Sequence, residues 1–169
     1  MMAMSHVLTS LAAWSVAAQY TSLEPTAGGM LAVIAGALLP DIDHPKSWLG
    51  RRLWFISAPL SLLIGHRGMT HSLLAVIALG AALTLYGPLG GYLIASVCIG
   101  YLTHMAGDFV TKGGIPVFWP LKRRFALPIM VTGSIVEFLS VAALMVALAY
   151  HQADYWTEQA GTLLNRGFI

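Results

Sequence analysis

Long apolar stretches alternate with short polar connections along this chain of 169 residues. An α-helix that crosses a bilayer needs about 20 mostly apolar residues. Five stretches reach or approach this length and are predicted to be membrane-spanning helices: 7–22, 26–39, 72–86, 91–107 and 126–150. A sixth stretch, 53–64, is shorter and contains Pro59, so we predict that it lies at the interface or re-enters the membrane.

The composition supports this interpretation, because 57% of the residues are hydrophobic and only 9% are charged. Soluble domains carry about a quarter charged residues, and disordered chains are still more polar. The sequence therefore predicts an all-α polytopic helical bundle that forms a single integral membrane domain over residues 1–169. A net charge of +2 without a basic helix argues against nucleic-acid binding.

Basic residues fall mainly in two connections, and cytoplasmic loops are the ones enriched in Lys and Arg. Four lie between the second and third predicted spans and four between the fourth and fifth: Lys46, Arg51, Arg52, Arg67, Lys112, Lys122, Arg123 and Arg124. If 53–64 does not cross, both connections lie on the cytoplasmic side and the N-terminus is cytoplasmic. If it crosses, the charge bias disappears.

Histidines and aspartates gather at the cytoplasmic ends of the predicted spans. The candidates are His6, Asp41, Asp43, His44, His66, His71, His104 and Asp108. His104 and Asp108 are four residues apart and share a helix face. Asp41 and Asp43 follow Pro40, and in an extended or turn backbone both could reach one point. Imidazoles combined with carboxylates suit Zn²⁺, Mn²⁺ or Fe²⁺, and the number of candidates allows one or two ions.

Each of these features also has a structural explanation. An Asp-x-Asp after a helix is often a cap or a solvated loop, and a histidine near the interface is often only amphipathic. The pair His104 and Asp108 could simply orient two helices. However, five of six histidines and three of four aspartates fall in one layer. This joint pattern favours a metal site, with His104, Asp108, His71 and Asp43 as preferred ligands and Asp41, His66 and His6 completing or bridging it.

Glu137 lies about eleven residues into the last predicted span, near the middle of the membrane. Intramembrane carboxylates are usually functional, so Glu137 is a candidate ligand or general base. The alternative is a protonated side chain that forms a hydrogen bond with a neighbouring helix.

Three motifs, LLPDIDHP, HRGMTHS and GYLTHMAGDF, together with His6, resemble those of the LexA-regulated, membrane-bound metal-dependent hydrolases, the YdjM-like family. The resemblance covers roughly residues 5–125. It implies a bacterial inner-membrane location and a hydrolase activity, and it carries over these positions: Asp41, Asp43, His66, Arg67, His71, His104 and Asp108. A weaker likeness to zinc-dependent phospholipases C is limited to ligand type and points toward phosphoesters.

The sequence thus predicts a metal-dependent hydrolase of a lipid or lipid-linked phosphoester, with zinc favoured. Arg67 would bind a phosphate oxygen, as a guanidinium fork does well, and Asp41 and Glu137 are further catalytic candidates. Thr70 and Lys112 could assist. A divalent metal-ion carrier and a non-catalytic membrane scaffold remain as alternatives.

Overall fold

The computed structural model describes residues 1–21, 23, 26–65 and 67–165, and the side chains of residues 64 and 154–165 lie outside that description. All regular elements of this part are helical, apart from two isolated β-bridges. The elements are α1 (Ala3–Tyr20), α2 (Ala27–Leu38), the 3-10 helix η1 (Leu39–Asp43), α3 (Trp48–Arg52), α4 (Trp54–Ile64), the 3-10 helix η2 (Met69–His71), α5 (Leu73–Tyr86), α6 (Gly91–Phe109) and α7 (Ile135–Asn165). The all-α prediction is confirmed.

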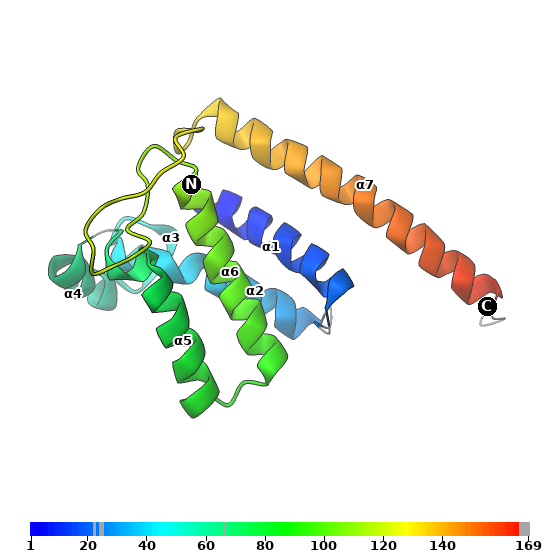
Figure 1. Cartoon of the computed structure of the whole chain (residues 1–169), viewed down its shortest axis with the longest axis horizontal. Helices are drawn as coiled ribbons and strands as arrows, with labels where there is room; N and C mark the ends of the chain where they lie inside the picture. Colours follow the sequence, from blue (N-terminus) through cyan, green and yellow to red (C-terminus); the bar gives the residue numbers. More distant parts are fainter. Residues whose placement is uncertain (22, 24–25, 66, 166–169) are drawn as a thin grey trace.

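Helices α1, α2 and α6 form the centre of the bundle, and α5 packs on the other side of α6 (Figure 1). Glycines let α2 and α6 approach closely. A Cβ atom at Gly36 would lie 2.1 Å from the carbonyl oxygen of Val97, and one at Gly100 would lie 2.1 Å from that of Val33. Only residues without a side chain fit at these two points, so the backbones of α2 and α6 are in direct contact.

Polar caps and turns define where the helices of the bundle begin. The Thr26 hydroxyl accepts a hydrogen bond from the N–H of Gly29 at the start of α2, and Ser72 does the same for Ala75 at the start of α5. The connections place the beginning of α1, the end of α2, the beginning of α5 and the end of α6 close together. The polar motifs of the sequence lie at these four helix ends.

The last helix begins later than the sequence predicts. Residues 126–134 form an extended segment, in which the N–H of Leu127 donates to the carbonyl of Phe109. Pro128 disfavours a helix here, and Gly133 has a φ of 76°, which also ends any regular helix before α7. Helix α7 starts at Ile135, where the Ser134 hydroxyl accepts a hydrogen bond from the N–H of Glu137. Glu137 therefore lies in the first turn of α7, and its predicted position in the middle of a span is wrong.

Helix α7 lies along α1 and then extends away from the other helices (Figure 1). Its segment Ile135–Ala153 is, among the described residues, the one helix that is both long enough and apolar enough to cross a membrane. Trp54–Leu63 and Leu73–Tyr86 are apolar but shorter. Helix length and apolarity therefore do not confirm the prediction of five spans. The segment predicted at 53–64 is a helix, α4, with Pro59 inside it.

Candidate metal centre

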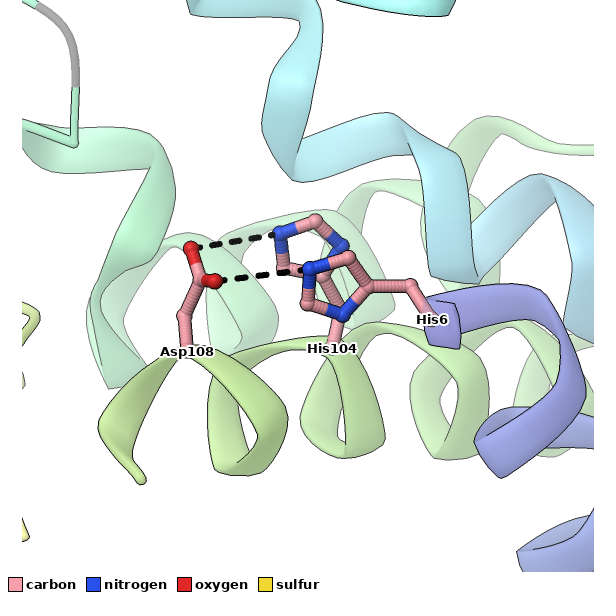
Figure 2. Close-up of side chains that lie close together, drawn as sticks. All are labelled: His6, His104 and Asp108. Carbon is pink, nitrogen blue, oxygen red and sulfur yellow. Dashed lines mark ion pairs between the residues drawn. The ribbon is translucent and has the colours of Figure 1, made fainter. Parts of the chain in front are cut away.

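Five predicted metal ligands come together where the four helix ends meet. Two groups have ligand atoms within 4.8 Å of one another, and they share His104: His6, His104 and Asp108 form one, and Asp41, His71 and His104 form the other. Figure 2 shows the first group, with His6 reaching from α1 toward His104 and Asp108 on α6. Except for Asp41, which is partly exposed, all of these side chains are buried.

The rings of His71 and His104 are held so that their Nε2 atoms face each other. The Nδ1 of His104 lies 2.6 Å from the carbonyl oxygen of Ala37, and the Nδ1 of His71 lies 3.5 Å from Oδ2 of Asp43. A carbonyl only accepts hydrogen bonds, and the Thr70 hydroxyl, 3.0 Å from Nδ1 of His71, already donates to Asp43, so we assign the proton of each neutral ring to Nδ1. In this tautomer Nε2 is the nitrogen of each ring that can bind a metal.

Several atoms that can bind a metal therefore lie close together. The two Nε2 atoms are 3.3 Å apart, and Oδ2 of Asp108 lies 3.5 Å from that of His71 and 3.8 Å from that of His104. Oδ1 of Asp41 lies 3.9 Å from His104 Nε2. Such an arrangement of imidazoles and carboxylates is stabilised by a cation. The residues therefore fit a divalent transition metal, by geometry and by ligand type.

The His6 ring lies parallel to the ring of His104, with centroids 3.6 Å apart and an interplanar angle of 11°. Asp108 lies at one edge of the stacked rings (Figure 2). Its Oδ1 lies 3.4 Å from Nε2 of His6, whereas its Oδ2 faces His104 and His71 (Figure 2). Nδ1 of His6 is buried and has no hydrogen-bond partner among the described residues. The carboxylate of Asp108 thus connects the two groups of candidate ligands.

Asp43 lies beside His71 and not among the converging ligand atoms. Its Oδ2 accepts hydrogen bonds from the Thr70 hydroxyl and, at 3.0 Å, from the N–H of Arg67. The expectation that Asp41 and Asp43 point the same way assumed an extended or turn backbone. Asp41 and Asp43 are two positions apart in the 3-10 helix η1, so their side chains point in directions about 240° apart around the helix axis. Their carboxylates therefore diverge. Metal-binding histidines commonly have such a carboxylate on the other ring nitrogen.

The electrostatic surroundings of His71 favour positive charge. Burial disfavours the charged ring, but hydrogen bonds to Asp108 and Asp43 outweigh it and raise the pKa of His71 above its usual value. A site that favours a proton on this ring in the absence of metal is suited to hold a cation there.

Arg67 contributes a positive charge beside the site, with Nη2 2.7 Å from Oδ1 of Asp108. The amino group of Met1 also donates to this oxygen. A cavity of about 430 Å³ opens onto this region, and Asp41 and Arg67 line it together with His44, Lys46 and Arg51. The partly exposed edge of the site therefore faces a polar cavity bordered by cations.

Glu137 is not part of the converging set. Glu137 is fully buried, where its Oε1 accepts from the N–H of Met2 at 2.7 Å and its Oε2 accepts from the N–H of Gly133 at 2.8 Å. It joins the start of α7 to the start of the chain. His66 lies outside the described residues. His44 lines the polar cavity but belongs to neither ligand group.

Backbone features complete the site, and residue types alone do not reveal them. The carbonyl of Ala37 fixes the His104 ring. Gly107 lies against His6, since a Cβ atom there would be 3.2 Å from the ring. The glycine at position 107 is the feature of the sequence that could have indicated a side chain packed closely against α6. The Tyr101 hydroxyl donates to the carbonyl of Thr70 at 2.6 Å and so ties α6 to η2.

Comparisons with known proteins agree with the motifs. The family described as "YdjM inner membrane protein" matches residues 1–165. The chain is 40% identical over 178 residues to "Inner membrane protein YdjM" of Escherichia coli (strain K12) and to that of Shigella flexneri, covering 94% of this chain and 90% of each relative. It is 34% identical over 148 residues to "Uncharacterized protein YvsG" of Bacillus subtilis (strain 168), covering 87% and 91%. No solved structure was found to match.

Proposed function

Because the chain belongs to the YdjM inner membrane protein family, we propose that it is a metal-dependent hydrolase in the bacterial inner membrane, acting on a lipid-linked phosphoester. The name of the YdjM relatives describes a membrane location, and none of the names of the relatives given above states an activity. The observation that carries the proposal is the close approach of the Nε2 atoms of His71 and His104, which are 3.3 Å apart and have carboxylates beside them.

In this proposal α1, α2, α5, α6 and α7 lie in the membrane, with the metal centre at the cytoplasmic face. Many large apolar side chains are exposed on these helices, among them Leu31, Ile77 and Leu85. In water this surface would be costly, whereas lipid would cover it. The basic connections border the same end of the bundle as the site, in agreement with a cytoplasmic orientation. Helix α4 then lies at the interface.

His71, His104 and Asp41 would hold one ion, and His6 and Asp108 would hold a second. The rings of His6 and His104 lie in two nearly parallel planes, which favours two ions over one. Two such ions would supply the chemistry of a two-metal hydrolase. Zn²⁺ suits the ligands best, and Mn²⁺ and Fe²⁺ are compatible.

When bound, such ions supply the Lewis acidity that makes water nucleophilic near neutral pH. The protein binds and orients the reactants. Arg67 binds a phosphoryl oxygen through the donors that Asp108 does not use, and Asp43 keeps the His71 ring in place. In the hydrolysis a water oxygen bonds to phosphorus, the bond from phosphorus to the ester oxygen breaks, and the water proton ends on the leaving oxygen. Asp41, at the cavity, is placed to accept that proton in transit.

Transport of metal ions would need ionisable groups along the membrane interior. Among the acidic residues whose side chains are described, Asp41, Asp43 and Asp108 gather at the site, and Glu137 is engaged by backbone N–H groups. No observation favours the carrier or the scaffold over the hydrolase.

The test is the metal content of the purified protein in detergent, followed by assays with lipid phosphoesters. We expect the wild type to retain a transition metal, and the double variant His104→Ala/Asp108→Ala to lose both the metal and any metal-dependent turnover. His151→Ala is the matched control, because His151 is exposed on α7. A wild-type protein without metal, or unchanged turnover in His104→Ala, would contradict the proposal.

A further inference from the structure

A second cavity, which we call the basic cavity, lies on the other side of Arg67 from the metal centre. It measures about 300 Å³ and is lined by Gly65, Arg67, Gly68, Pro116, Trp119, Lys122 and Arg124. Three of these residues are cations and none is acidic. None of the candidate metal ligands within the described part of the chain lines it. The basic cavity therefore has the charge of an anion site.

Arg67 is held in place by contacts that its neighbours make from several directions. Its backbone has a φ of 55°, a conformation that is uncommon for a residue with a side chain, and its N–H donates to Asp43. Its guanidinium contacts Asp108, and a Cβ atom at Gly113 would lie 2.1 Å from Nη1. Gly113 thus makes room for the guanidinium. Arg67 is only 13% exposed.

One donor of Arg67 remains unused. Nε is buried and has no hydrogen-bond partner among the described residues, although a buried donor of this kind is costly to leave unpaired. Arg67 also lines the polar cavity that contains Asp41. The same guanidinium therefore borders the metal centre on one side and the basic cavity on the other. An anion bound in the basic cavity would be adjacent to one bound at the metal centre.

We propose that the basic cavity binds a second phosphoryl group of the substrate, so that the substrate is a lipid diphosphate and not a lipid monophosphate. This inference rests on the proposed function. One phosphoryl group would lie at the metal centre, and the other would contact Arg67, Lys122 and Arg124. Two guanidinium forks and an ammonium group match the oxygens of a phosphoryl group that carries more than one negative charge. The indole of Trp119 adds an apolar wall beside them.

The test measures binding to detergent-purified protein from which metal has been removed with a chelator, so that the result depends on the cavity and not on hydrolysis. The ligands are farnesyl diphosphate, farnesyl monophosphate and inorganic diphosphate. We expect farnesyl diphosphate to bind at least about tenfold more tightly than either of the others. Equal affinity for the two farnesyl compounds would overturn the proposal. Equal affinity for the two diphosphates would overturn its lipid part, since a free anion would then suffice.

The variant Lys122→Gln/Arg124→Gln should lose this preference for the diphosphate and keep the affinity for the monophosphate. The matched control is Arg52→Gln/Arg123→Gln, which removes the same charge from exposed residues that do not line the cavity. An equal loss in both double variants would indicate a general charge effect and overturn the assignment.

The two proposals can fail separately. A protein that hydrolyses phosphoesters with its metal but shows no preference for the diphosphate would contradict only the second proposal. A protein that prefers the diphosphate but retains no metal would contradict only the hydrolase.

Discussion

The side chain of Asp43 offers a sharp test of the proposed metal centre, because Asp43 orients the candidate ligand His71 and is not itself among the converging ligand atoms. Oδ2 of this carboxylate contacts the Thr70 hydroxyl, the N–H of Arg67 and Nδ1 of His71. In Asp43→Asn the amide oxygen can take the position of Oδ2 and accept the same hydrogen bonds. The shape of the site is then kept, and what is lost is the negative charge beside His71.

The expected cost follows from the type of contact. Mutation of the carboxylate that orients a metal-bound histidine typically weakens metal binding 10- to 100-fold. This corresponds to about 1.4–2.7 kcal/mol of binding free energy. By contrast, His104→Ala removes a residue common to both candidate ligand groups, so we expect its loss of affinity to exceed that of Asp43→Asn clearly.

The assay is a competition titration of the purified protein in detergent with a chromogenic zinc chelator, alongside thermal unfolding of the metal-free form. Thr70→Val is a useful companion, because it removes one hydrogen bond to Asp43 and keeps the charge. If Asp43→Asn binds zinc as tightly as the wild type, the orienting role is refuted. If it loses zinc as completely as His104→Ala, Asp43 is itself a ligand, as the sequence predicted.

Three further predictions concern the bundle. Gly100→Ala should destabilise the protein by about 1–3 kcal/mol, because the new Cβ atom would meet the Val33 carbonyl of α2, whereas Gly91→Ala, with open space around it, should change the unfolding free energy little. Glu137→Ala should lower the free energy of unfolding by about 1–3 kcal/mol, because it leaves the N–H groups of Met2 and Gly133 unpaired. The zinc stoichiometry should stay unchanged. Loss of zinc with the fold intact would instead support the predicted role of Glu137 as a ligand or base. Trp14→Phe should cost about 0.5–1.5 kcal/mol through the lost hydrogen bond to Ser96, measured by thermal unfolding, whereas Trp48→Phe, at a residue exposed on α3, should be close to neutral.

The sequence predicted the helices well where apolar runs end at strong signals. Pro40 follows the second run and Gly87 closes the third, and the helices end near these residues. The last run was misleading because residues 126–134 are apolar as well. Several of their backbone hydrogen bonds join them to residues 109–112, and a contact so far away along the chain leaves no periodic pattern in the sequence.

The meeting of His and Asp residues was also predictable, since the alternation of spans brings every second helix end to the same side. The division of roles among them was not. It depends on the 3-10 conformation of η1, which makes the side chains of Asp41 and Asp43 diverge. It also depends on the backbone carbonyl of Ala37, a group that all residues have and that therefore leaves no signal in the sequence. The parallel stacking of His6 on His104 likewise depends on how α1 approaches α6, and no spacing in the sequence encodes it.

The glycine contact between α2 and α6 limits how this centre could change. Asp41 follows α2, whereas His104 and Asp108 belong to α6, so the register between the two backbones fixes the spacing of the ligands. Sliding one helix by a single residue would move its ligands by about 1.5 Å, far more than metal–ligand bonds tolerate. Adaptation of the proposed centre to another metal would therefore require exchange of the ligating side chains, because the register between α2 and α6 can change only by whole residues.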